Sequence, residues 1–515
     1  MAAETSDASA ASDDAPDGGP RPSGPLDSDL ETGPEPGDDS GPGSGLDFDF
    51  GSLTGRGRTP PTTALLARPR SPEEVAAAVR AGGAPGGRGC VARGLGLAHG
   101  DAARNAGGTV IDLTGLDRVR AVDADAGVVL CDAGVRLRRL AQTLLPLGWS
   151  LPLLPARPAP AGSGGATVGG ALAADLHGGD HRVSGSFARH VASFELLTAD
   201  GGVRTVVPGT PLFDATAGGL GLTGVILSVA VRLRRVDTAL LAVDTERVSC
   251  LDDLLSRLAS TGRRYRSSTA WLDLLAPGPA LGRGVLTRAL HVPLDALPAR
   301  ARGHHRAYPG FVAGSVPPAL ALRASRLPVV PAGLVPDGLL GTGAVRALNT
   351  LRFRAAPQRR TRGLRPLTRP PAPLPRLDRA YGRSGFVRYE CAVGLGHEDA
   401  LHRIARAVAR RGVPVPSATL QRLGDPGSGL LSFPLPGWAL ALDIPASAKG
   451  LGRFLDELDE EGARKGGRVA LAQDARMRPE LLAVMYPRLD RFRALRAEFD
   501  PGGTFTSDLA RRLAL

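Results

Sequence analysis

The sequence predicts an α+β protein built from two differently organised regions. Between residues 51 and 236, short apolar strands alternate with two or three helices. From residue 237 onward, strand-like runs are each followed by a helix, which favours an antiparallel sheet with helices on one face. Three glycine-rich turns lie at strand ends of the first region. Because such turns bring backbone N–H groups together, they indicate a ligand site there.

Residues 1–50 differ in composition from the rest of the chain. They hold thirteen Asp and Glu residues and one Arg, with many Gly, Pro, Ser and Ala. Such a segment buries too little apolar surface to offset the entropy lost on ordering, so we expect a disordered acidic tail. The whole chain carries a formal charge of +12, which leaves +24 on residues 51–515.

This positive charge does not predict a nucleic-acid partner. It comes almost entirely from Arg, since only Lys449 and Lys465 are lysines. Aromatic residues are sparse, and no stretch interleaves them with basic residues as a single-strand binder would. We therefore expect no nucleic acid among the partners.

Cysteine usage and hydropathy indicate the compartment. The four cysteines are widely spread and lack metal or redox spacing, so we expect neither a metal site nor a disulfide framework. No apolar run is long enough to span a membrane, and no secretory signal is recognisable. A cytoplasmic protein is expected, with peripheral contact at the inner face of the membrane left open.

Local signals predict individual elements of the first region. Residues 63–82 indicate a strand and then a helix, with Ser71 as N-cap and Pro72 at the first helical position. Residues 193–207 indicate a hairpin around Asp200, Gly201 and Gly202.

The second region is predicted more coarsely. Strands are expected at 385–395 and 438–446, followed by helices at 398–411 and 449–465. The Arg- and Pro-rich stretch 352–377 is expected to be a poorly ordered loop. A single helix is expected at 479–497, before the segment DPGGTFTSDLARRL.

The glycine-rich turns are weak signals when each is taken alone. The first, RGLGLAHG (93–100), is neither a dinucleotide fingerprint nor a P-loop, and in a chain with 68 glycines an incidental turn is the simpler interpretation. The others are TVGGALAADLHG (167–178) and GLGLTGVI (219–226). Three such turns within about 130 residues are harder to dismiss than one.

Taken in order, the motifs resemble those of a known family. LTGRGRTPP, ARGLGLAHGD, TVGGALAADLHG, SGSFARHV, LLTADG and GLGLTGVI follow one another as in FAD proteins of the vanillyl-alcohol-oxidase superfamily, which includes aldonolactone oxidases. Within it, STAWLDLL, RAYGRSGFVRYEC, LSFPLPGW and MYPRLD resemble the decaprenylphosphoryl-β-D-ribose 2′-oxidase family. The resemblance covers residues 51–515 and is weakest between 280 and 375.

The resemblance implies a two-domain fold. Residues 51–236 would form an FAD-binding domain of two α/β subdomains, and residues 237–478 an antiparallel-sheet domain that caps the flavin. Residues 479–515 would return to the FAD domain. FAD would be held without a covalent bond, because the position where many relatives carry a flavin-linked His is Leu97.

The resemblance also assigns residues to the cofactor. Those implied to lie along FAD are Arg93, Gly94, Leu95, Gly96, Leu97, Ala98, His99, Gly100, Thr167, Gly169, Gly170, Asp175, His177, Gly178, Gly221, Thr223, Gly224 and Val225. The turn at Gly94 to Gly100 would hold the pyrophosphate.

Three residues are implied in catalysis, in which a hydride leaves a carbinol carbon for flavin N5 while a base takes the hydroxyl proton. His177 matches the family's active-site His, although a packing role at a helix start is the plainer alternative. Cys391 matches a pocket-lining Cys, with a buried small hydrophobe as its alternative. Gln421 occupies the position of a Lys at the flavin edge.

Several departures from the family pattern surround the cofactor. Gln421 and Gly179 replace lysines, Ala98 and His99 replace Ser and Tyr, and about six extra residues fall within 158–165. Arg422 could supply the missing charge only through a strand bulge, because neighbouring side chains on a strand face opposite ways. Either the substrate has changed or catalysis has weakened.

Three functions remain open on the sequence alone. The first is oxidation of a sugar-type alcohol, such as a polyprenylphosphoryl ribose used for cell-wall arabinan precursors, with a short-chain reductase partner completing an epimerisation. The second is an aldonolactone or sugar-alcohol oxidase that uses oxygen, similar to D-arabinono-1,4-lactone oxidase. The third is a degenerate flavin-binding paralogue without catalysis.

Overall fold

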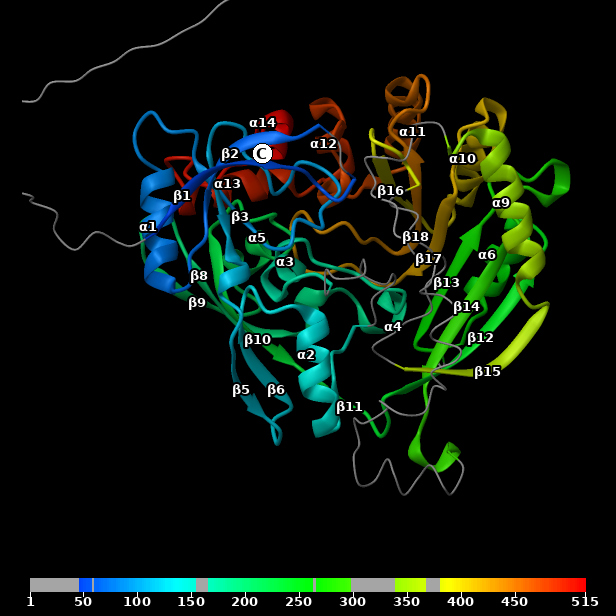
Figure 1. The fold of residues 1–515 in the computed structure, drawn as a ribbon, viewed down its shortest axis with the longest axis horizontal. Helices are drawn as coiled ribbons and strands as arrows, with labels where there is room; N and C mark the ends of the chain where they lie inside the picture. Colours follow the sequence, from blue (N-terminus) through cyan, green and yellow to red (C-terminus); the bar gives the residue numbers. More distant parts are fainter. Residues whose placement is uncertain (1–45, 58–59, 154–164, 263–264, 298–338, 367–379) are drawn as a thin grey trace, which may run out of the picture. The chain divides into compact units, whose positions relative to one another are not determined.

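The computed structural model describes residues 46–57, 60–153, 165–262, 265–297, 339–366 and 380–515, without the side chains of 361–366. Residues Ser44–Leu515 form one compact unit. The described residues form a four-stranded, a five-stranded and a two-stranded sheet, all from the first half of the chain, and one large antiparallel sheet (Figure 1).

The first sheet has four strands in the order β1-β2-β4-β3. These are β1 (Phe48–Leu53), β2 (Thr62–Ala67), β3 (Cys90–Arg93) and β4 (Thr109–Asp112). Strands β2, β4 and β3 run parallel, whereas β1 is antiparallel to β2. Helix α1 (Pro72–Gly82) connects β2 to β3, and Ser71 caps it by accepting a hydrogen bond from the Glu74 N–H, as predicted.

The predicted tail boundary at residue 50 was wrong. Residues Phe48–Phe50 belong to β1 and pair with Leu65–Ala67 of β2. Strand pairing satisfies the backbone whatever the side chains are, so an acidic composition did not exclude a strand here. Residues 1–45 of the predicted tail lie outside the described residues.

The second sheet has five antiparallel strands in the order β5-β6-β10-β8-β9. They are β5 (Val119–Asp123), β6 (Val128–Asp132), β8 (Val191–Leu197), β9 (Val203–Val206) and β10 (Val225–Arg232). The hairpin of β8 and β9 confirms the predicted turn. The associated elements are α2 (Leu137–Leu144), α3 (Val168–Ala173), α4 (His181–Ser184), α5 (Pro211–Thr216), β7 (Trp149–Ser150) and β11 (Arg234–Arg235).

One hydrophobic core joins these two sheets. Ile111 of β4 and Val79 of α1 share a buried cluster with Val129 of β6, Phe194 of β8 and Val168 of α3. Burial of these apolar side chains fixes the ends of β3 and α3 relative to each other.

The third sheet has eight antiparallel strands in the order β15-β12-β14-β13-β17-β18-β16-β19. They are β12 (Leu240–Val248), β13 (Ser267–Leu272), β14 (Gly284–His291), β15 (Arg359–Pro366), β16 (Phe386–Gly394), β17 (Ser417–Leu423), β18 (Gly437–Pro445) and β19 (Arg468–Val469). Its helices include α6 (Leu251–Ala259), α9 (Thr342–Ala355), α10 (Glu398–Arg411) and α11 (Leu451–Arg464). Leu258 of α6, Ile404 of α10 and Leu455 of α11 share a core with Leu440 and Leu442 of β18, so these helices cover one face of the sheet.

Two predictions in this region were wrong. Within the expected loop 352–377, α9 continues to Ala355, β15 spans Arg359–Pro366 and pairs with β12, and residues 367–377 lie outside the described ones. A strand that begins with two exposed arginines, Arg359 and Arg360, is well tolerated at the edge of a sheet. The helix expected at 479–497 is two helices, α12 (Pro479–Met485) and α13 (Leu489–Phe499), because Pro487 cannot continue a helix.

The C-terminal segment lies along the edge of the first sheet. Cys90 of β3 exchanges backbone hydrogen bonds with Thr504 and Thr506, at 2.7 and 2.9 Å. Helix α14 (Asp508–Leu513) follows, and the Asp508 carboxylate accepts from Thr62 Oγ1 at 2.9 Å. The chain end thus returns to the first region (Figure 1).

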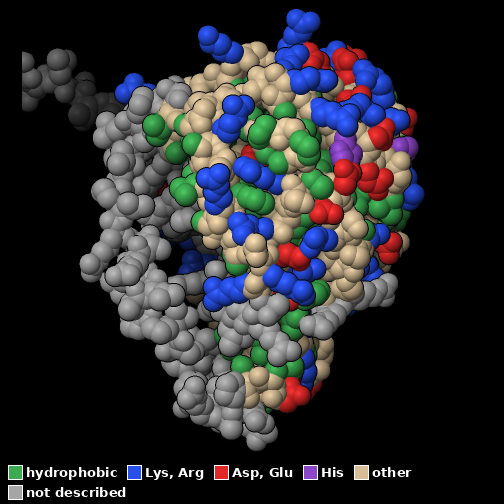
Figure 2. Space-filling view, turned by 90° about the vertical axis from the view of Figure 1, so that its right-hand side faces the viewer, with side chains coloured by type: hydrophobic (Ala, Val, Ile, Leu, Met, Phe, Trp, Pro, Cys, Tyr) green, Lys and Arg blue, Asp and Glu red, His purple; other side chains and the backbone are tan. Residues whose placement is uncertain are grey.

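Acidic and basic side chains alternate on the outer side of the large sheet. Figure 2 shows arginines and carboxylates side by side on this face of the molecule. Ion pairs link α10 to its neighbour α11, as between Arg403 and Glu461 and between Arg411 and Glu457. Among the described residues, no helix combines the length and the apolar character that a membrane crossing requires.

Candidate active site

The turn after β3 presents unpaired backbone N–H groups. In the described part of the chain, no N–H from Leu95 to Gly100 donates to a protein acceptor. Gly96 has φ +63°, in the left-handed region that favours glycine. A backbone hydrogen bond fixes the turn, since Arg56 N donates to Ala98 O at 2.9 Å. Free N–H groups on a rigid turn are suited to bind the oxygens of an anion.

Two of the residues predicted to contact the cofactor, Arg93 and Gly100, instead contact protein atoms around this turn. The Arg93 guanidinium donates to Ala103 O at 2.9 Å and to Thr54 O at 2.7 Å. Gly100 packs against the backbone of Asp474, where an added Cβ would lie 1.7 Å from the carbonyl oxygen. Both residues therefore shape the turn through contacts with protein.

The second motif meets the first. An added Cβ on Gly94 would lie 2.4 Å from Thr167 Oγ1, so the turn and the start of α3 are in contact. Thr167 Oγ1 accepts from Gly170 N at 3.2 Å and caps α3. Gly169 lies against Ala133, leaving no space for a side chain. These residues place a helix N-terminus beside the unpaired N–H groups.

The third motif lies beside α3. Leu220 N donates to Ala173 O at 2.9 Å. Gly221 has φ +79°, and a Cβ added there would face open space. Thr223 is fully buried and its hydroxyl pairs with that of Thr216 at 2.9 Å.

The third motif then leads into β10. Gly224 has φ +150° and lies so close to Leu197 O that only glycine fits, and Val225 begins β10. The structure thus brings all three glycine-rich motifs together, as expected for one ligand.

Asp175 does not belong with the cofactor residues. It is fully buried, and its carboxylate accepts from Ser186 Oγ at 2.7 Å, Ala188 N at 3.0 Å and Ser432 Oγ at 2.6 Å. A carboxylate with three protein donors is satisfied by the protein itself. The prediction that Asp175 contacts the cofactor is therefore corrected: Asp175 ties the loop after α3 to the segment before β18.

Opposite the helix-covered face, the large sheet presents a second face, which we call the site face. Strand register sets three rows on it: Gln421, Ala439 and Ala392; Thr419, Ala441 and Glu390; and Ser417, Asp443 and Arg388. The central strand contributes only small side chains in the first two rows. Such a floor lets a flat ring approach the sheet closely.

His177 reaches this face from the loop between α3 and α4. His177 Nε2 lies 3.4 Å from Glu390 Oε1, and its ring packs against Phe433 with centroids 5.3 Å apart. Glu390 also contacts Arg388 at 3.3 Å, and Arg388 pairs with Asp443 at 3.0 Å. Burial opposes ionisation of Glu390, but the Arg388 charge and the His177 contact hold its pKa below the ordinary value.

Neighbouring histidines are neutral. Burial and the charges of Arg388 and Arg56 lower the pKa of His99 to about 3, and its ring contacts Gln473 and Phe386. Burial and the proximity of His177 lower the pKa of His181 to about 3, and Gly424 N donates to His181 Nδ1 at 3.0 Å.

His99 therefore links the glycine turn to the site face, and His181 links α4 to β17. Gly178, whose carbonyl accepts from His181 N at 3.1 Å, lies between His177 and α4.

Comparison with known proteins identifies the family. The FAD binding domain family matches residues 63–206. Decaprenylphosphoryl-beta-D-ribose oxidase of Mycolicibacterium smegmatis is 36% identical over 470 residues, which cover 90% of this chain and 97% of that protein. The chain belongs to this family of FAD-dependent oxidoreductases. An uncharacterized protein in the mprA 5′ region of Streptomyces coelicolor is 51% identical over 389 residues, 74% of this chain and 100% of that protein.

FAD is thus the cofactor of this oxidoreductase, and the site fits it. Unpaired N–H groups, a left-handed Gly96 and the adjoining start of α3 match the needs of a pyrophosphate. Open space at Gly221 leaves room for another part of the same ligand.

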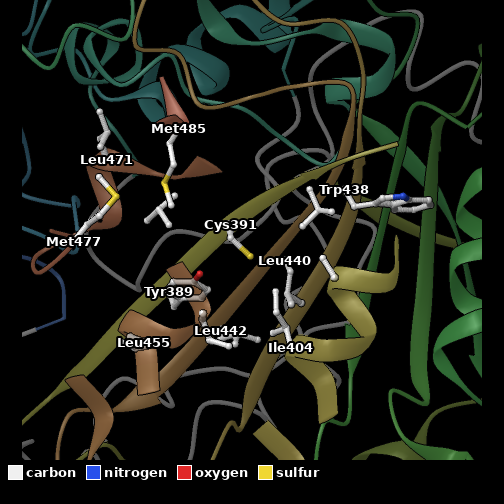
Figure 3. Packing of buried hydrophobic residues seen from close by; sticks show 14 of the residues in the cluster. Tyr389, Cys391, Ile404, Trp438, Leu440, Leu442, Leu455, Leu471, Met477 and Met485 are labelled. Carbon is white, nitrogen blue, oxygen red and sulfur yellow. The ribbon is translucent and has the colours of Figure 1, made fainter. Parts of the chain in front are cut away.

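Cys391 lies on the wrong face for the predicted pocket role. It belongs to the helix-covered core, and Figure 3 shows its sulfur among Tyr389, Leu440 and Ile404. Burial raises the pKa of its thiol to about 12, so no thiolate forms near neutral pH. The prediction that Cys391 lines the substrate pocket is corrected, because adjacent Glu390 and Cys391 project to opposite faces of β16.

The adjacent residues Gln421 and Arg422 likewise lie on opposite faces of the sheet. Gln421 is buried on the site face, in the row of Ala439 and Ala392. Arg422 donates to Ala259 O of α6 at 2.9 Å and lies over the Trp438 ring, on the helix-covered face. The register of β17 with β18 is continuous from Ser417 to Leu423, so no bulge carries Arg422 across.

Glu390 and Arg388 lie at the site but were not among the residues predicted from the sequence. A signal was available, because these two charged residues alternate with apolar ones in FVRYECAVG and so share one face of the strand. Charged residues at alternate positions of an otherwise buried strand indicate a polar site on that face.

Proposed function

We propose that this enzyme holds FAD without a covalent bond and oxidises a secondary alcohol of a sugar-type substrate. The observation that carries the proposal is the pairing of His177, from the loop between α3 and α4, with an ionised Glu390 beside the small side chains Ala439 and Ala441 of the site face. Leu97 cannot form a flavin bond, which supports non-covalent binding. The name of the Mycolicibacterium relative suggests a polyprenylphosphoryl ribose as the substrate, and the family resemblance suggests its 2′-hydroxyl as the group oxidised.

The residues divide the chemistry between them. Bound FAD would accept the hydride that leaves the carbinol carbon. His177 would take the hydroxyl proton, since imidazole is the usual base near neutral pH. Gln421 would donate a hydrogen bond at the flavin edge, and Ala439 and Ala441 would leave space for the ring and the sugar.

Partners follow from this chemistry. A lipid-linked sugar would bring the enzyme to the inner face of the membrane, where peripheral contact suffices. A short-chain reductase that reduces the resulting ketone from the other face would complete an epimerisation at that carbon.

One observation favours a second candidate, a flavin-binding paralogue with weak or no turnover. Neither Arg422 nor Arg388 replaces the lysine that the family carries at the position of Gln421, because Arg422 lies on the opposite face and Arg388 is paired with two carboxylates. A reduced flavin without a nearby positive charge is harder to form.

The visible spectrum of the purified protein tests both candidates. We expect a yellow protein that releases FAD on acid denaturation and that bleaches anaerobically with a short-chain polyprenylphosphoryl ribose. The variant His177→Gln should keep FAD but bleach about 10²–10⁴ times more slowly. A flavin that stays oxidised with lipid-linked pentoses and bleaches with an aldonolactone would support the oxygen-using oxidase instead. A flavin that no sugar alcohol bleaches would support the paralogue.

A further inference from the structure

His177 is held between a carboxylate and an aromatic ring. Its side chain is only 13% exposed, and that of Glu390 is 7% exposed. Phe433 packs against one side of the imidazole, and His181 lies edge-on with ring centroids 6.2 Å apart. The ring thus has a restricted orientation, with Nε2 toward the sheet.

Glu390 has the charge needed to fix that orientation. It stays ionised despite its burial because Arg388 lies 3.3 Å away. Arg388 is also hydrogen-bonded to Asp443, so the three groups together carry one net negative charge beside His177. An ionised carboxylate 3.4 Å from Nε2 favours the tautomer with the proton on Nε2.

The other titratable groups near His177 do not compete with this effect. His181 is neutral, and its Nδ1 is occupied by the Gly424 N–H. His99 is neutral, and Arg56 and Arg388 lie close enough to it to lower its pKa. Glu390 is therefore the described carboxylate in direct contact with His177.

Resting on the proposed function, we propose that Glu390 is a positioning residue for the oxidation. Its carboxylate holds His177 by Nε2–H and leaves Nδ1 to take the proton of the substrate hydroxyl. Bound FAD would accept the carbinol hydrogen with its two bonding electrons as hydride, the O–H proton would move to Nδ1, and the electrons of the O–H bond would form the carbon–oxygen double bond.

A purely structural role would look different. If Glu390 only neutralised Arg388, it would be dispensable, since Asp443 already holds Arg388 at 3.0 Å with good hydrogen-bond geometry. A structural Glu390 would also leave the tautomer of His177 unchanged when its charge is removed.

The experiment compares Glu390→Gln with wild type in the full-length, FAD-loaded enzyme. NMR of ¹⁵N-labelled histidine gives the tautomer of neutral His177, whose signal is assigned by its loss in His177→Gln. Rapid mixing gives the rate of flavin reduction by a short-chain polyprenylphosphoryl ribose. In wild type we expect the proton of the neutral ring on Nε2, and in Glu390→Gln we expect a mixture of the two tautomers. The rate of reduction should fall about tenfold to a hundredfold.

Two further variants complete the test. Glu390→Asp keeps the charge and should keep mostly the Nε2–H tautomer of His177, so it also serves if Glu390→Gln folds poorly. Glu398→Gln removes a carboxylate that contacts Trp438 instead, and should match wild type. An unchanged tautomer of His177 in Glu390→Gln overturns the proposal. A wild-type flavin that no sugar alcohol reduces overturns the proposed function, and the tautomer of His177 alone then decides the role of Glu390.

Discussion

The two faces of the eight-stranded sheet are built from the same strands but differ in what they bury. On the helix-covered face, Cys391, Leu440 and Leu442 pack under α10 and α11 in an apolar core. On the site face, Glu390 and Gln421 lie among alanines and charged residues, next to His177. Adjacent residues of one strand project to opposite faces, so one residue packs in the apolar core and the next lies on the site face.

This difference between the faces shows why a motif can be placed correctly at the site while one residue within it is assigned to the wrong face. The segment FVRYEC does reach the site, yet its final Cys faces the helices. An alignment shifted by one residue exchanges the two faces, because side chains on a strand repeat every second residue.

Substitutions of two adjacent residues of β18, which lie on opposite faces, are expected to give the largest difference in stability and in ligand binding. Leu440→Ala opens a cavity in the helix-covered core and should lower the free energy of unfolding by about 2–5 kcal/mol. Ala439→Leu places a large side chain on the site face and should block ligand binding with a smaller loss of stability. Urea denaturation and FAD content measure both variants. If Leu440→Ala abolishes flavin reduction while keeping FAD and fold, the assignment of the faces is wrong.

A smaller effect is expected in the first glycine turn. Gly96→Ala forces a side chain into a left-handed conformation and against Arg93, so FAD should bind about fivefold to thirtyfold more weakly, as about 1–2 kcal/mol of strain implies. Gly201→Ala is the matched control, because Gly201 also has positive φ but lies in the β8–β9 hairpin. Equilibrium titration of apoprotein with FAD gives the affinities. Equal losses in both variants would show that the turn does not hold the cofactor.

Much of the fold was predictable from local signals. The Ser71 cap, the hairpin at Gly201 and the strand–helix pairs of the second region follow from residue chemistry within a few positions. The strand at 359–366 was not predictable, because its pairing with β12 is a contact between segments more than 100 residues apart. Propensity alone cannot indicate such pairing.

The site was predictable in part. The three glycine motifs do come together, and His177 does reach a charged cluster. Asp175 could not be excluded from the sequence, because its donors Ser186 and Ser432 come together only in the fold. Glu390 was not predicted, because the family resemblance indicated its neighbour Cys391, which lies one residue farther along the same strand.

We expect the face of the large sheet that carries Gln421, and not the face that carries Arg422, to meet the flavin. The reduction potential of the bound FAD in two variants distinguishes the two faces. Gln421→Lys should raise the potential by about 30 mV, the equivalent of about 1.4 kcal/mol for a two-electron couple, because a cation stabilises reduced flavin. Arg422→Ala should leave the potential unchanged, since its guanidinium contacts α6. A potential that moves in Arg422→Ala and not in Gln421→Lys would contradict the account.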